Sequence, residues 1–233
     1  MKHLVILTGA GISAESGLAT FRDSDGLWQQ YDVMELASLQ GYRRNRERVL
    51  DFYNARRRQL ATVKPNHAHH VLAELERAYR VSIITQNVDD LHERAGSTHV
   101  LHLHGELTKV TGSMNPNDPR CITERALDQP ISLGDKAADG SQLRPYIVFF
   151  GESVPNIQAA AKLVQESDIF VVIGTSLVVY PAANLLRSVP RGVPGFLIDP
   201  VEVEAGQMAG LEPIQATAVA GVDILKQRLQ AMG

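Results

Sequence analysis

The sequence predicts an α/β fold in which a doubly wound parallel sheet carries a small inserted module. Short apolar runs rich in β-branched residues recur along the chain, and several are continuous, as is typical of strands covered on both faces. Helical patterns separate these runs, and strands that alternate with helices indicate a parallel sheet. Residues 108–143 depart from this pattern because they are dense in Gly, Asn, Asp, Ser and Pro, which predicts the inserted module.

The elements follow in order from the apolar patterns. The expected strands are residues 4–7, 81–85, 100–103, 147–150, 169–173 and 196–198. The expected helices are residues 13–16, 34–38, 46–60, 68–79, 89–95, 157–166, 181–188 and 222–231. We expect one domain, with a large lobe formed by about residues 1–107 and 144–233. The small module would combine about residues 108–143, where the pattern allows only a short helix near 122–127, and a helical insertion at about 28–63.

Composition narrows the function classes. A chain of 233 residues with 44% hydrophobic content can bury a sizeable core, and a net charge of −3 gives no general reason to bind nucleic acid or an anionic membrane. Cys121 is the single cysteine, which excludes an intrachain disulfide and a zinc site made of thiolates. The sequence has no signal-peptide pattern and no membrane-length apolar run. We therefore expect a soluble cytoplasmic protein, and we expect a monomer.

A glycine-rich turn follows the first strand. Its spacing is G-x-G-x-x-G/A, and small residues there let the backbone approach a pyrophosphate at a helix N-terminus. The candidate dinucleotide contacts are Gly9, Ala10, Gly11, Ile12 and Ala14. A tight strand-to-helix connection with no ligand has the same composition, so context must decide between the two interpretations. With the alternating strands and helices, the turn favours a Rossmann-like large lobe.

The segment ATFRDSDGLWQQYD lies where an ordinary dehydrogenase has a strand ending in an acid. It is turn-rich and aromatic, and its acids lie in a loop. We expect a lid over the cofactor, with Phe21 covering a ring and Arg22 contacting a phosphate or carboxylate. The alternative places Phe21 in the core and Arg22 in solvent.

Polar residues follow several of the expected strands. In a parallel sheet these strand ends line the ligand crevice, where amide and hydroxyl groups can bind ribose, a carboxamide or phosphate. The candidates are Gln86, Asn87, Asp89, Gly174, Thr175, Ser176 and, for the adenosine ribose, Asp199. Helix capping by Asn87 or Asp89 is the alternative for those two residues. Convergence of four polar strand ends on one crevice favours a binding site.

The segment HVLHLHGE places three histidines around one strand. His99, His102 and His104 suggest a metal site only weakly, because no nearby residues complete a set of ligands. His104 stands where the chain leaves the strand, which favours a general base. A structural histidine is the alternative.

The stretch FYNARRRQL predicts a helix with an arginine on its apolar side. At about 100° per residue, Arg56 falls on the same side as Phe52 and Tyr53, whereas Arg57 lies near the edge of that stripe and Arg58 lies opposite. A guanidinium in the middle of an apolar face must reach solvent or meet an anion. A protein carboxylate is one such anion, and a ligand is the other.

These motifs together resemble the sirtuins, a family of NAD-dependent protein-lysine deacylases. GAGISAESGLATFR, TQNVDDLH, HLHGE, FFGESVP and GTSLVVYPAA match the family's motifs in order over nearly the whole chain. The pair Tyr53 and Arg56 resembles the Tyr-x-x-Arg of desuccinylase-like members. The resemblance therefore implies that NAD is the cofactor and that acylated lysine side chains of proteins are the substrates. It also implies that Tyr53 and Arg56 grip the distal carboxylate of a succinyl or malonyl group, with acetyl a weaker substrate.

The resemblance also implies roles for the other candidates. His104 would be the general base on a ribose hydroxyl, and Asn87 the second catalytic residue, with Asp89 near the nicotinamide ribose and Gln86 orienting it. The products would be nicotinamide, free lysine and O-acyl-ADP-ribose. The implied cofactor contacts further include Glu15, Trp28 and Ala218, and the implied peptide channel consists of Val148, Phe149, Phe150 and Gly151, which could pair strand-fashion with substrate.

Two departures from the family pattern stand out. Many sirtuins hold a structural zinc with two Cys-x-x-Cys pairs, and counting from the flanking motifs puts Gly112, Asn115, Lys136 and Asp139 at those positions. We therefore expect no zinc, and a small module held by packing. Asp199 stands where an Asn is usual. A plain deacetylase, an NAD or ADP-ribose binding module without turnover, and a mono-ADP-ribosyltransferase are the competing functions.

Overall fold

A six-stranded parallel sheet forms the centre of the computed structural model, which describes residues 1–19, 32–201 and 210–232. Its spatial order is β3-β2-β1-β7-β8-β9. The strands are β1 (His3–Thr8), β2 (Arg80–Thr85), β3 (Val100–His102), β7 (Ile169–Ile173), β8 (Gly195–Asp199) and β9 (Leu211–Gln215). The chain builds outward from β1 to β3 and then returns to the other side of β1. This reversal confirms the expected doubly wound α/β fold, and it puts a topological switch point between β1 and β7.

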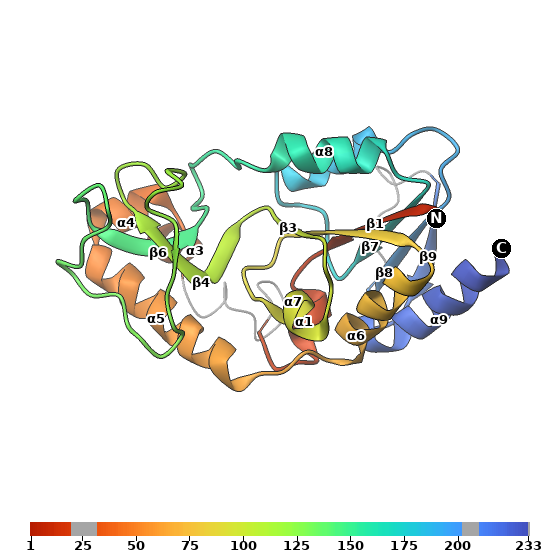
Figure 1. Cartoon of the computed structure of the whole chain (residues 1–233), viewed down its shortest axis with the longest axis horizontal. Coiled ribbons are helices and arrows are strands. Elements are labelled where there is room, and N and C mark those ends of the chain that lie inside the picture. The colour runs from red at the N-terminus through yellow and green to blue at the C-terminus, as the bar shows by residue number, and fades with distance from the viewer. Residues whose placement is uncertain (20–31, 202–209, 233) are drawn as a thin grey trace.

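Helices cover both faces of this sheet (Figure 1). On one face, a core around Ile6 and Val171 packs against α1, α6, η1 and α9. On the other, a core around Leu7 and Val172 packs against α8 and η2. The bounds are α1 (Gly11–Ala14), α6 (His67–Glu74), η1 (Leu75–Arg77), α7 (Leu91–Ala95), α8 (Ile157–Gln165), η2 (Ala182–Ser188) and α9 (Ala218–Ala231). Because both faces are covered, β1 and β7 are buried along their whole length, as their continuous apolar runs predict. Among the described helices, none has both the length and the apolarity needed to cross a membrane.

A third core lies beside the sheet, at the left of Figure 1. It joins two distant segments of the chain, one helical and one built from an antiparallel three-stranded sheet in the order β5-β4-β6. The elements are α3 (Val33–Leu36), α4 (Leu39–Arg44), α5 (Arg46–Thr62), β4 (Gly105–Gly112), β5 (Thr123–Glu124) and β6 (Leu143–Ile147). Asp32, Ser38 and Asn45 cap the three helices, each accepting a backbone N–H through its side chain. We call this unit the small module.

Several sequence expectations about elements are wrong. No helix forms near 122–127, because Thr123 and Glu124 pair with β4 instead. The expected strand 147–150 is displaced: β6 ends at Ile147, and the next residues turn so that Phe149 enters the small-module core. Sequence patterning also missed α4, β4 and β9. β9 contains Pro213 and is half exposed, as an edge strand can be, so its apolar signal is weak.

Arg57, which helical geometry put at the edge of the apolar stripe, is fully buried. Its guanidinium meets carbonyls rather than an anion: Nη1 donates to Leu107 O at 2.5 Å, and Nη2 donates to Ala126 O at 2.7 Å and to Arg125 O at 3.0 Å. One turn earlier, the Asn54 amide donates to Ile131 O at 2.9 Å and accepts from Ile131 N at 2.8 Å. Helix α5 therefore fastens the irregular segment 125–131 to the module by hydrogen bonds.

We expect Arg57→Met to lower the free energy of unfolding by about 2 to 4 kcal/mol, because the substitution leaves the buried Leu107 carbonyl and the part-buried carbonyls of Arg125 and Ala126 without this donor. Urea denaturation measures this loss. Arg58→Met is the matched control, since Arg58 is the exposed neighbour on the same helix and should change stability by less than about 0.5 kcal/mol. Equal losses in the two variants would contradict the anchoring role of Arg57.

Candidate active site

The loops that follow β1 and β7 meet at the switch point of the sheet. Gly9 N donates to Ile173 O at 3.0 Å, and Gly11 N donates to Gly174 O at 2.9 Å. A Cβ on Gly9 would lie 2.6 Å from the Cβ of Thr175, and a Cβ on Gly11 would lie 2.7 Å from the Cα of Gly174. Both glycines are therefore required by the close approach of two protein loops, a reason that the sequence motif alone does not reveal. This contact fixes the floor of a large cavity.

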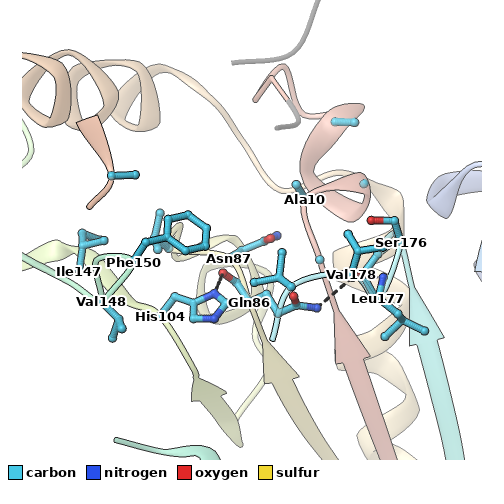
Figure 2. A pocket seen from close by; sticks show the side chains of 18 of the residues that line it. Ala10, Gln86, Asn87, His104, Ile147, Val148, Phe150, Ser176, Leu177 and Val178 are labelled. Atoms are coloured by element: carbon cyan, nitrogen blue, oxygen red, sulfur yellow. Dashed lines mark hydrogen bonds between the residues drawn. The ribbon is translucent and has the colours of Figure 1, made fainter. Parts of the chain in front are cut away.

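The cavity has a volume of about 1150 Å³ and lies between the strand ends and the small module. Figure 2 shows Gln86, Asn87 and His104 at neighbouring strand ends, between Phe150 on one side and Ser176 on the other. Most of the residues singled out from the sequence line this one cavity. They are Gly9, Ala10, Gly11, Ala14, Glu15, Tyr53, Arg56, Gln86, Asn87, His104, Val148, Phe149, Phe150, Gly151, Gly174, Thr175, Ser176, Asp199 and Ala218.

Two described site residues, Ile12 and Asp89, do not line the cavity, and three more predicted ones lie outside the described residues. The Ile12 side chain is fully buried in the sheet core, so only its backbone could contact a ligand. Asp89 is also buried, and it is linked to Asn87 through Ser13. Phe21, Arg22 and Trp28 fall outside the described residues.

His104 is oriented by a backbone carbonyl. Its Nδ1 lies 3.0 Å from Gln86 O (Figure 2), and because a carbonyl can only accept, Nδ1 carries the proton. In the neutral ring, Nε2 is then the basic nitrogen. Burial lowers the pKa of His104 from its ordinary value, which favours this neutral form at physiological pH. The side chain is thus held in the tautomer that a general base at a cavity wall requires.

Asn87 is held by a residue that the sequence interpretation did not single out, Ser13. The Asn87 Nδ2 group donates to Ser13 Oγ at 3.1 Å, and Ser13 Oγ donates to Asp89 Oδ2 at 3.1 Å. Asp89 Oδ1 also accepts from Leu91 N at 3.2 Å, while burial raises the pKa of Asp89. Asp89 therefore acts on the cavity through Ser13, and it fixes which way the Asn87 amide faces. The position of Ser13 two residues after Gly11 was the available signal.

Gln86 links two strand ends across the switch point. Its Nε2 donates to Thr175 Oγ1 at 3.0 Å, and its backbone N donates to Thr8 O at 2.9 Å. On the far side of the glycine loop, Glu15 Oε2 accepts from Val219 N at 3.1 Å, which ties α1 to the start of α9 beside Ala218. Asp199 ends β8 at the same edge of the sheet. These contacts keep the strand ends that line the cavity together.

Arg56 and Tyr53 line the opposite end of the cavity. Tyr53 is buried, with its ring centroid 5.7 Å from that of Phe149 and 5.1 Å from that of Phe52. Arg56 Nη1 donates to Gln59 Oε1 at 2.8 Å, and no ion pair found among the described residues includes Arg56. Burial lowers the pKa of Arg56, but an arginine stays charged at neutral pH. A cation and a phenol therefore face the cavity together, from one turn of α5.

Comparison with known proteins decides the family. The family model described as "Sir2 family" matches residues 9–181. The chain belongs to the Sir2 family. It is 55% identical over 230 residues to the NAD-dependent protein deacylase of Bacteroides thetaiotaomicron, covering 98% of each chain. It is 52% identical over 232 residues to that of Helicobacter pylori, covering 100% of this chain and 99% of the relative.

Solved Sir2 structures have the same fold. A mutant Sir2 homologue in complex with ADP-ribose superimposes with a TM-score of 0.87 at 39% identity, covering 99% of this chain and 93% of that one. A Sir2 protein with a p53 peptide and NAD+ gives a TM-score of 0.76 at 30% identity, covering 98% and 93%. The sequence resemblance to sirtuins is thereby confirmed at the level of the family.

The wall formed by residues 148–151 of this Sir2 chain is partly paired already. Phe150 N donates to Ala37 O at 2.8 Å, and Phe150 O accepts from Leu39 N at 2.9 Å. Val148 N donates to His104 O at 2.9 Å. The N–H of Phe150 is therefore already used in this arrangement, so strand-like pairing of a peptide with residues 148–151 would use other backbone groups, and the predicted peptide channel stays a prediction. The Phe150 side chain is exposed at the cavity, where it can contact substrate.

A buried ion pair holds this wall in place. Arg144 Nη1 donates to Glu152 Oε1 at 2.7 Å, and Glu152 Oε2 accepts from Phe149 N at 2.8 Å. The Arg144 guanidinium lies 3.9 Å from the Phe149 ring centroid, within cation–π distance. Because Arg144 is fully buried, losing Glu152 would leave an uncompensated charge in the core.

The lowered pKa of His104 gives an expected pH dependence for a reaction in which His104 is the general base, as the sequence predicts. A base whose pKa is below the ordinary 6.5 loses its proton at lower pH, so kcat/KM for acyl-peptide should rise with pH through an apparent pKa below 6.5 and level off by neutrality. A pH–rate profile from about pH 5 to 8 measures this limb. A midpoint above 6.5 would contradict the effect of burial on the pKa of His104.

Proposed function

We propose that this Sir2-family enzyme is an NAD-dependent protein-lysine deacylase that prefers succinyl and malonyl groups and removes acetyl groups more weakly. Relatives named NAD-dependent protein deacylases share more than half of their residues with it over nearly the full chain, which supports the reaction class. The observation that carries the site assignment is His104, held as a neutral base at the wall of a cavity that also contains Arg56.

The residues at the strand ends fit NAD. The cavity of about 1150 Å³ is slightly larger than the usual range for small-molecule sites, and its hydroxyl and amide groups suit ribose, phosphate and carboxamide. When bound, NAD supplies a ribose that accepts the acyl group and a nicotinamide that leaves. We assign the phosphates to the loops at 9–11 and 174–176, and the nicotinamide ribose to Gln86 and Asn87.

His104 performs the proton transfer in this proposal. Its Nε2 accepts a proton from a ribose hydroxyl, and the Nδ1–H bond to Gln86 O keeps the ring in place as positive charge develops on it. Asn87, fixed through Ser13 and Asp89, orients the ribose and the carboxamide. The exposed Phe150 ring covers the acyl-lysine side of the cavity. An NAD-binding module without turnover has no use for an oriented base, which favours catalysis.

The acyl preference rests on Arg56 and Tyr53. A succinyl or malonyl carboxylate that reaches this end of the cavity would receive a charge-assisted hydrogen bond from the guanidinium and a second bond from the phenol. An acetyl group has no carboxylate to place there, so it would leave the cation without a counter-charge. Lysine deacetylation without acyl preference is the second candidate, and it requires Arg56 to be directed at water.

We further propose that the small module folds without zinc. In the described part of the chain, no group of three or more His, Cys, Asp and Glu residues is arranged to hold a metal ion. Two of the four positions aligned with the family's cysteines, Gly112 and Asp139, meet in space: a Cβ on Gly112 would lie 2.8 Å from both Asp139 carboxylate oxygens. Asp139 Oδ1 accepts from Ser141 N and Oγ at 2.9 and 2.7 Å. Hydrogen bonds here, and those of Arg57, would replace the metal.

Two experiments test these proposals. Mass spectrometry and steady-state kinetics with NAD follow the reaction of a matched pair of succinyl-lysine and acetyl-lysine peptides. Thermal denaturation with and without EDTA tests folding without zinc. We expect free lysine peptide and O-acyl-ADP-ribose, a higher kcat/KM for the succinyl peptide, and the same melting temperature with and without EDTA. ADP-ribosylated protein, or no product, would contradict the deacylase proposal. A melting temperature lowered by EDTA would contradict folding without zinc.

A further inference from the structure

Gln59 lies one turn beyond Arg56 on α5 and contacts its guanidinium, and it belongs to none of the sequence motifs that resemble the sirtuin family. Its Oε1 accepts from Arg56 Nη1 at 2.8 Å, and its Nε2 donates to Gly17 O at 3.3 Å. Gly17 lies just beyond α1, so Gln59 joins α5 to the segment that follows the glycine-rich loop. Arg56 is half-buried and has no ion-pair partner among the described residues.

The orientation of the Gln59 amide follows from its partners. A backbone carbonyl can only accept a hydrogen bond, so the NH₂ side of the amide must face Gly17 O, and the oxygen side must then face Arg56. The amide oxygen satisfies one guanidinium N–H without carrying a charge. The positive charge of Arg56 is therefore held in place without an ion-pair partner among the described residues, which leaves it available to an anionic ligand.

A glutamate at position 59 would change both the charge beside Arg56 and the hydrogen bond to Gly17. Its carboxylate would neutralise Arg56 in a half-buried site, and it would also place an acceptor against the Gly17 carbonyl, where a donor is needed. An apolar side chain of similar length would leave Arg56 charged but free to move among rotamers. The identity of residue 59 as glutamine thus matters separately for the charge and for the geometry of Arg56.

We infer that Gln59 is a positioning and specificity-determining residue, which selects anionic acyl groups by orienting Arg56 while leaving its charge unpaired. This inference rests on the proposed acyl-carboxylate role of Arg56. The substrate class is a lysine acylated by a short dicarboxylic acid, whose distal carboxylate takes the counter-charge position that Gln59 leaves open. Gln59 itself does not line the cavity, so it acts through Arg56.

The test measures kcat and KM for succinyl-lysine and acetyl-lysine versions of one peptide in the full-length chain with NAD. Gln59→Glu should lower kcat/KM for the succinyl peptide by about tenfold or more, mainly through KM, and change the acetyl value by less than about twofold. Gln59→Met should give a smaller succinyl loss, also in KM, because the charge of Arg56 is kept. Gln40→Glu, at an exposed position of α4, is the matched control for the added charge and should behave as wild type.

The outcomes separate this inference from the proposed function. If the wild type prefers succinyl peptide and Gln59→Glu keeps that preference, the role of Gln59 is overturned while the deacylase proposal stands. Equal losses on both peptides in Gln59→Glu and Gln59→Met would also overturn it, because they indicate a purely structural role. A wild type without succinyl preference would overturn the acyl-carboxylate role of Arg56, and the role of Gln59 with it.

Discussion

Replacing His104 with alanine should lower kcat/KM by about 10² to 10⁴-fold on every acyl group, because the variant lacks the base that accepts the ribose proton. Binding of NAD should change little, since the phosphate loops and strand ends are held together by Gly9, Gly11 and Gln86 rather than by the His104 side chain. Steady-state kinetics on succinyl and acetyl peptides, with calorimetric titration of NAD, measure the two effects separately.

His99→Ala is the matched control for this experiment. His99 is an exposed histidine from the same segment and does not line the cavity, so its variant should keep wild-type turnover. Retained turnover in His104→Ala would refute the assignment of the base. Loss of NAD binding together with turnover would show instead that His104 holds the cavity together.

Replacing Arg56 with methionine should depress desuccinylation far more than deacetylation. A charge-assisted contact to a desolvated carboxylate is worth roughly 2 to 4 kcal/mol, which corresponds to a loss of about 30- to 1000-fold in kcat/KM for the succinyl peptide. The acetyl peptide makes no such contact, so its kcat/KM should change by less than about threefold. The selectivity ratio of the two peptides is therefore the measured quantity.

Arg58→Met provides the control, because it removes the same charge from the solvent side of the same helix. It should leave both peptides unaffected if the charge of Arg56 acts locally. Equal losses on the two peptides in Arg56→Met would count against a carboxylate site. They would favour the interpretation in which Arg56 only supports the packing of α5.

The central sheet was predictable because its signal is local. Strands buried on both faces produce continuous apolar runs, and β7 was predicted with the bounds that the structure shows, Ile169–Ile173. Edge and antiparallel strands were not predictable by the same rule. β9 is half exposed and contains Pro213, and β4 begins and ends with glycine, so neither has the apolar pattern that marks a buried strand.

The contacts of two buried residues, Arg57 and Ser13, illustrate the same limit of prediction from sequence. Arg57 was placed at the edge of a helical stripe, yet it is fully buried and donates to carbonyls of β4 and of the distant irregular segment 125–131. Ser13 connects Asn87 to Asp89 from a different strand end. The helical pattern predicts only the side of the helix on which a side chain lies. It does not predict which segments, 50 to 70 residues later in the chain, pack against that side.

By itself the sequence determined the fold class, the family and the set of chemical groups that meet in the site, because glycine spacing, strand-end polar residues and apolar runs are properties of neighbouring residues. Only the tertiary structure decided which nitrogen of His104 is basic, what orients Asn87, and that Arg56 donates to the uncharged amide oxygen of Gln59. Each of these depends on hydrogen bonds between residues far apart in the chain, and such bonds exist only after the sheet and the small module have packed together.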